Sequence, residues 1–200
     1  MVFTTLVLKK YVNFVATLRP GFSRRWAALF LLLLPLLVWA SNFAVLEART
    51  RLENGVYLLT AKIDYDLSPA ALEALRNGIP LTVSLEMEVW RRREWLWDEL
   101  IASLQQRFHL EYHALARQYV VINLNNGEQK SFPTRLAATD YLGRISNFPL
   151  LDASLLGPAD GCYGRLRATL DIEALPAPLR PLAYLSNEWH LTSEWYVWPF

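Results

Sequence analysis

The stretch VYLLTAKIDYDL, residues 56–67, decides the fold of this chain because its side chains alternate in character with a period of two. Every odd position from Tyr57 to Leu67 is apolar or aromatic, whereas Thr60, Lys62, Asp64 and Asp66 are polar. Such alternation is typical of a β-strand with one face on a core and the other in water. We therefore expect a domain built mainly from half-buried strands.

The residues that follow predict a short helix and then a second strand. Ser68 can cap a helix N-terminus and Pro69 suits the first helical position, while Asn77-Gly78 is a helix-stop signal. From Leu81 to Val89 the alternation resumes, with Thr82, Ser84, Glu86 and Glu88 on the polar face. The sequence thus predicts a strand, a short helix and a second half-buried strand in this order.

Further strand and turn signals continue to the end of the chain. Strands are expected at 99–114, 118–124, 129–132, 165–172 and 188–200, a turn at 125–127, a second helix at 135–144, a loop at 147–161 and a proline-rich crossover at 175–181. The sequence thus predicts an α+β fold, a mostly antiparallel β-sheet or sandwich of six or seven strands with two short helices. A single domain is expected over residues 54–200.

An N-terminal leader precedes that domain. Residues 26–40 are 15 uncharged, mostly apolar residues, and the preceding 1–25 carry five basic residues and no acidic one. As a helix the run spans about 22 Å, less than the roughly 30 Å of a bilayer core, so a signal peptide ending near Ala40 is one reading. If the helix continues to Val45, residues 26–45 form a membrane anchor. Both versions leave residues 1–25 in the cytoplasm and export the body.

Charge and cysteine content exclude several classes of function for the body. Of the 20 basic residues five precede the apolar run, which leaves 15 against 19 acidic residues in the body. A mildly acidic domain does not suit nucleic acid, and none is expected as a partner. Cys162 is the only cysteine, so neither an internal disulfide nor a thiolate metal cluster can form within one chain. No cofactor or metal is predicted.

The segment WRRREWLW, residues 90–97, brings three arginines and three tryptophans together within eight residues and is the strongest candidate binding segment in the chain. Its arginines and tryptophans can clamp an anion, stack on a planar ligand or lie at a lipid interface. The alternative is internal, with arginine stacking on tryptophan and pairing with Glu94, Asp98 or Glu99 in a bent hairpin. The candidate binding residues are Trp90, Arg91, Arg92, Arg93, Trp95 and Trp97.

Two polar groups elsewhere are weaker candidates. Asp64, Asp66, Glu86 and Glu88 would form a carboxylate cluster if their strands were neighbours, and paired carboxylates bind Ca²⁺ or hydrolyse glycosides. Solvated strand faces produce the same pattern. His109 and His113 flank Glu111, but on a strand the two histidines lie about 13 Å apart, too far for one metal ion.

Several blocks resemble the bacterial domain of unknown function 4390. They are Glu73–Leu81, Arg91–Trp95 with Trp97-Asp98, Tyr112–Leu115 before Gln118-Tyr119, and Leu175–Arg180 before Trp189 and Ser193. The resemblance covers about Asn54 to the C-terminus. It implies an exported or membrane-anchored bacterial protein and supplies no catalytic residues.

We therefore expect a non-enzymatic binding module of the cell envelope, at the bacterial inner membrane facing the periplasm or periplasmic after cleavage near Ala40. Its partners would be an envelope protein and, if the leader is uncleaved, the membrane through residues 26–45. One alternative is an envelope hydrolase or carbohydrate-active enzyme that uses the paired carboxylates. Another is a structural component that pairs through the aromatic C-terminal strand.

Overall fold

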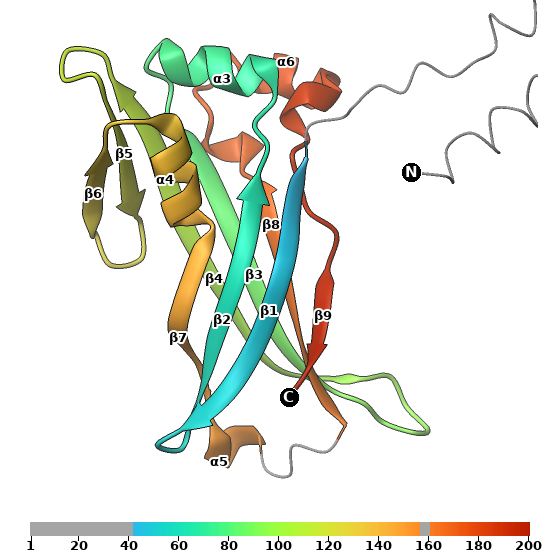
Figure 1. Ribbon diagram of the computed structural model, residues 1–200. Coiled ribbons are helices and arrows are strands. Elements are labelled where there is room, and N and C mark those ends of the chain that lie inside the picture. The colour runs from blue at the N-terminus through green and yellow to red at the C-terminus, as the bar shows by residue number, and fades with distance from the viewer. Residues whose placement is uncertain (1–41, 157–160) are drawn as a thin grey trace, which may run out of the picture. The chain divides into compact units, whose positions relative to one another are not determined.

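Two antiparallel sheets, packed face to face, make up the part of the chain that the computed structural model describes, residues 42–156 and 161–200 (Figure 1). The smaller sheet has the order β1-β2-β7, with strands β1 (Phe43–Glu53), β2 (Val56–Tyr65) and β7 (Arg144–Asp152). The larger sheet has the order β6-β5-β4-β3-β8-β9, with β3 (Leu81–Arg91), β4 (Glu99–His113), β5 (Gln118–Asn123), β6 (Gln129–Phe132), β8 (Cys162–Leu170) and β9 (Tyr196–Pro199). The prediction of a mostly antiparallel β fold is confirmed.

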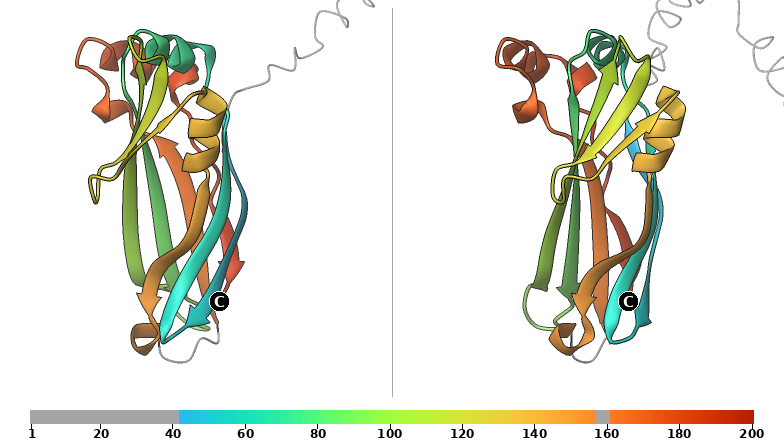
Figure 2. Two further views of the ribbon diagram at one scale, coloured as in Figure 1. Left: turned by 60° about the vertical axis from the view of Figure 1, so that its left-hand side comes forward. Right: turned by 90° about the vertical axis from the view of Figure 1, so that its left-hand side faces the viewer.

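The core lies between the sheets and follows the period of two read from the sequence. The inward residues of β3, from Leu81 to Val89, are at most 2% exposed. They face the apolar side of β2, where Leu59 is fully buried, and β1 packs on β8 and β9. Helix α4 (Arg135–Leu142) contacts β2 of the smaller sheet and β5 of the larger one, so it bridges the two sheets where β7 begins (Figure 2).

Short helices cap the sandwich at its two ends (Figure 1). One end carries α3 (Pro69–Arg76), α6 (Arg180–Leu185) and the 3₁₀ turns η1 (Ile172–Ala174) and η2 (Asn187–Trp189), and the other carries α5 (Ala153–Leu156). As predicted, Ser68 caps α3, since its Oγ accepts a hydrogen bond from the Ala71 amide at 3.1 Å, and Gly78 follows the helix with φ +78°. The described residues hold four α-helices rather than the two expected.

Strand β1 was not predicted, and it corrects the N-terminal boundary of the domain. The residues Phe43–Val45, which a longer anchor helix would include, belong to this strand, so the domain begins well before residue 54. The alternation is hidden because the pairing with β2 shifts register between Val45 and Glu47. No helix among residues 42–156 and 161–200 is long and apolar enough to cross a bilayer, and the run 26–40 lies outside those residues.

Two other predictions were wrong in the C-terminal half. The expected loop at 147–161 instead contains the end of β7 and helix α5, because irregular pairing with β2, positive φ at Asn147 and the presence of Pro149 disguise the strand. Residues 188–200 do not form the single long strand that was expected. They contain most of the 3₁₀ turn η2, then Thr192, which forms an isolated bridge with Thr169, and finally the four-residue strand β9.

Candidate functional site

The loop between β3 and β4 projects from one end of the sandwich (Figures 1 and 2). It carries three consecutive exposed apolar side chains. Trp95, Leu96 and Trp97 are 93%, 63% and 88% exposed. We call these three residues the hairpin tip. Single apolar residues are common on protein surfaces, but a contiguous cluster with two tryptophans is typical of a contact surface.

Ionic and hydrogen-bond contacts hold the base of this hairpin. Arg93 and Glu99 form an ion pair at 2.5 Å, and Arg91 lies 3.6 Å from the same carboxylate. Arg91 also donates a hydrogen bond to the carbonyl of Leu156 in α5. Two of the three arginines therefore share Glu99 as a partner. Pairing with this residue was part of the alternative in which the arginines bind within the protein rather than to a ligand. The arginines fix the loop to its own strand and to α5.

The third arginine of the segment and Asp98 contact β8. The Asp98 carboxylate accepts a hydrogen bond from the Tyr163 hydroxyl at 2.7 Å, and the Arg92 guanidinium lies 5.5 Å from the Tyr163 ring centre. Partial burial, and then the hydrogen bond to Asp98, raise the pKa of the Tyr163 hydroxyl. Contacts on both sides of the loop therefore leave only the tip itself unsupported.

Trp90 is separated from the tip and lies on the outer face of the larger sheet. There the Arg165 guanidinium lies between two indoles, 4.6 Å from the ring centre of Trp90 and 4.3 Å from that of Trp195. Arg165 also pairs with Glu88 at 2.5 Å, and Trp90 donates to the same carboxylate at 2.6 Å. The expected stacking of arginine on tryptophan is present, but the arginine comes from β8, about 75 residues further along the chain.

The condition for a carboxylate cluster is not met. Asp64 lies in β2 of the smaller sheet, and Asp66 follows that strand, whereas Glu86 and Glu88 lie in β3 of the larger one. Glu86 pairs with Arg167 at 2.6 Å, as Glu88 does with Arg165. Within the described residues no group of three or more His, Cys, Asp or Glu side chains is placed to hold a metal ion. The structure does not bring these four carboxylates together.

The two histidines of β4 have separate contacts, and the tryptophan of the C-terminal strand is buried. On β4, His109 contacts Thr82 at 2.7 Å, while His113 contacts Glu111 at 3.0 Å. Trp198 in β9 is only 4% exposed and faces inward, so it does not present its ring to a partner. Strand β9 has four residues, which makes it a short sheet edge.

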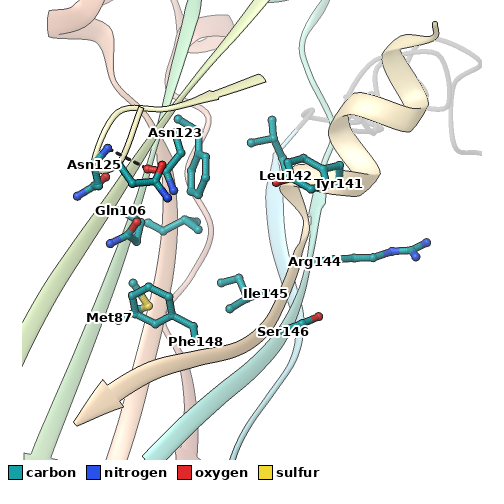
Figure 3. Close-up of a pocket in the computed structure, with 13 residues that line it drawn as sticks. Met87, Gln106, Asn123, Asn125, Tyr141, Leu142, Arg144, Ile145, Ser146 and Phe148 are labelled. Carbon is teal, nitrogen blue, oxygen red and sulfur yellow. Dashed lines mark hydrogen bonds between the residues drawn. The ribbon is translucent and has the colours of Figure 1, made fainter. Parts of the chain in front are cut away.

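A cleft that the sequence did not predict opens between the two sheets beside α4 (Figure 3). Its volume is about 410 Å³, and Met87, Phe108 and Phe148 supply much of its apolar wall. Amide side chains such as Gln106 and Asn123 line its rim. The lining contains no Asp, Glu, His or Cys, so it holds no pair of acid and base groups for hydrolysis. Because five elements contribute to it, no local sequence signal marks it.

These observations define a class of protein: a two-sheet antiparallel β domain with an exposed aromatic hairpin tip. Within the described residues the four predicted carboxylates lie on separate sheets, and no metal-binding group of three or more His, Cys, Asp or Glu side chains is present. The chain belongs to the DUF4390 family, described as a domain of unknown function, whose model matches residues 40–199. The match includes β1, in agreement with the corrected boundary. Neither the comparison with curated proteins nor that with solved structures gave a match.

Proposed function

We propose that this domain is a non-enzymatic binding module of the bacterial cell envelope, and that it docks a protein partner with the hairpin tip. The observation that carries the proposal is the exposure of Trp95, Leu96 and Trp97 on a loop whose base is fixed by ion pairs and hydrogen bonds. The leader at residues 26–40 supports the envelope location.

The energetics of the tip favour a binding role. Two exposed tryptophans offer roughly 400 Å² of surface, which corresponds to about 10 kcal/mol of gross hydrophobic stabilisation when a partner covers it. Binding entropy and desolvation offset part of this value. Because Arg91, Arg93 and Asp98 already hold the hairpin base, little further ordering of the backbone is needed. Tryptophan and arginine are also the residues most enriched at the centres of protein interfaces.

The position of the tip favours a protein partner over the bilayer of the leader. Asn42, the first described residue, lies at the end of the sandwich that carries α6, since its Oδ1 accepts a hydrogen bond from the Thr192 amide at 3.0 Å. The tip projects from the opposite end, which also carries α5, and the base of its hairpin contacts α5 through Arg91 (Figure 1). The tip therefore lies at the end of the sandwich remote from Asn42, at which the preceding segment joins the domain.

The proposal is tested with a matched pair of variants in the full-length chain. The double substitution Trp95→Ala/Trp97→Ala removes both tryptophans of the tip, and Leu136→Ala removes another exposed apolar side chain, on α4. We expect both to unfold at temperatures close to that of the unaltered protein, because exposed residues contribute less than about 0.5 kcal/mol to folding. After crosslinking in living cells, the tip variant should lose its protein adduct and Leu136→Ala should keep it. Equal adducts from all three proteins would contradict the proposal.

A further inference from the structure

The end of the sandwich opposite the tip carries a second set of exposed apolar side chains. Leu182, Tyr184 and Leu185 are exposed on α6, and Leu115 is fully exposed in the turn between β4 and β5. We call these four residues the α6-end patch. They share the end of the molecule at which Figure 1 shows α3, α6 and the top of β4.

Helix α6 buries its small residue and exposes its large ones, the reverse of an ordinary surface helix. Ala183 is the one buried residue of α6, whereas Leu185 is 88% exposed. A surface helix normally turns its apolar stripe to the core. The outward leucines of α6 therefore do not serve the packing of this domain and are free to contact another apolar environment.

The point at which the chain enters the domain identifies that environment. Asn42 is bonded to Thr192, which follows η2, and η2 packs on α6. The next residue, Phe43, is 2% exposed and stacks edge-on against Tyr65 at 4.8 Å. The entry point is therefore fixed to the core. Since the apolar run ends at Ala40, only Ser41 separates it from the anchored Asn42, a span of about 3.5 Å.

We propose that the α6-end patch is a membrane-contact surface, which lies in the interfacial layer of the bilayer that holds residues 26–40. This inference rests on the envelope location in the proposed function and on an uncleaved leader. A one-residue connection leaves this end of the domain no room to stand away from the lipid headgroups. Leucine and tyrosine side chains suit that layer, where apolar groups reach the acyl boundary and tyrosine hydroxyls stay hydrated.

The test places an environment-sensitive NBD dye on single cysteines in the full-length chain. The background is Cys162→Ala, and the labelled positions are Leu185→Cys in the patch and Leu155→Cys on α5, which is exposed at the tip end. The protein is reconstituted into vesicles of phosphatidylethanolamine and phosphatidylglycerol. We expect blue-shifted emission and quenching by spin-labelled lipid at position 185, and water-like, unquenched emission at position 155.

The reverse pattern, or equal quenching at both positions, would overturn the inference because the wrong end or the whole domain would then lie on the bilayer. Water-like emission at position 185 in a chain that resists carbonate extraction would also overturn it. Release of the chain by carbonate would also refute the inference, because the inference requires residues 26–40 to anchor the chain in the bilayer. None of these outcomes affects the tip, whose role is decided by the Trp95→Ala/Trp97→Ala variant.

A second variant separates lipid contact from a structural role of α6. Leu182→Ser/Leu185→Ser should leave the unfolding temperature unchanged, because both side chains already face water in the isolated domain. With the dye at Leu115→Cys, the same double substitution should cause a loss of quenching by spin-labelled lipid, whereas Leu155→Ser should not. Unchanged quenching at position 115 in the α6 double variant would refute the inference.

Discussion

A close approach between β8 and β9 provides a quantitative test of the fold. Gly164 lies opposite Trp198, and a Cβ atom added to Gly164 would lie 2.3 Å from Cζ2 and 2.5 Å from Cε2 of the Trp198 ring. Carbon atoms in proteins normally stay about 3.5–4.0 Å apart, so Gly164→Ala must displace the indole by roughly 1.2 Å or more. Trp198 is a buried core residue and has little free space in which to move.

The size of the effect follows from two limits. Overpacking a core costs about 1–3 kcal/mol, and complete loss of a buried tryptophan costs about 3–5 kcal/mol. We expect Gly164→Ala to lower the free energy of unfolding by about 2–4 kcal/mol. For a domain of this size that is a fall of roughly 5–15 °C in unfolding temperature. Urea titration, followed by circular dichroism in the aromatic region, measures it directly.

A double-mutant cycle makes the reasoning refutable. In a Trp198→Ala background the added methyl group has no ring to displace, so Gly164→Ala should cost less than about 0.5 kcal/mol. It should even be slightly favourable, because glycine weakens a strand by roughly 0.5–1 kcal/mol relative to alanine. An equal cost of Gly164→Ala in both backgrounds would show that the ring does not lie over Gly164.

Two further substitutions test single groups. Tyr65→Phe should raise the free energy of unfolding by about 1 kcal/mol in urea titrations, because the buried Tyr65 hydroxyl has no hydrogen-bond partner in the described structure; a loss of stability would refute this. Arg165→Met should lower stability by about 1–3 kcal/mol, since it leaves the half-buried carboxylate of Glu88 without its ion pair. The control Arg51→Met, in an exposed pair, should change stability by less than about 0.5 kcal/mol, and equal effects of the two would count against the argument.

Regular elements were predictable where local signals and tertiary packing agree. Strand β3 was anticipated because its apolar residues alternate from Leu81 to Val89, and α3 because Ser68 and Gly78 mark its two ends. The prediction failed where the chain departs from regular pairing. In β1 the register shift moves successive apolar residues out of alternation, and in β7 a bulge near Asn147 has the same effect. Long-range pairing holds both strands in place, and a single sequence does not show it.

The sequence predicted which residue types gather in the candidate site, but not where the fold places their side chains. The sequence marked residues 90–97 as a concentration of arginine and tryptophan, yet the fold divides that segment between the outer face of the larger sheet and the hairpin tip. Trp90 stacks on Arg165, whereas Trp95 and Trp97 project into water. That division depends on the pairing of β3 with β8, which brings together residues about 75 positions apart. For the same reason the sequence offered no signal for the cleft beside α4.

The most direct test of the central claim is site-specific photocrosslinking in living cells from position 96. A photoreactive amino acid replaces Leu96 at the tip or, as the control, Leu46 on the exposed side of β1. We predict one discrete protein adduct from position 96, its loss when Trp95→Ala/Trp97→Ala is added, and no such adduct from position 46. Adducts with lipid alone from position 96, or the same protein adduct from both positions, would contradict the claim that the hairpin tip docks a protein partner.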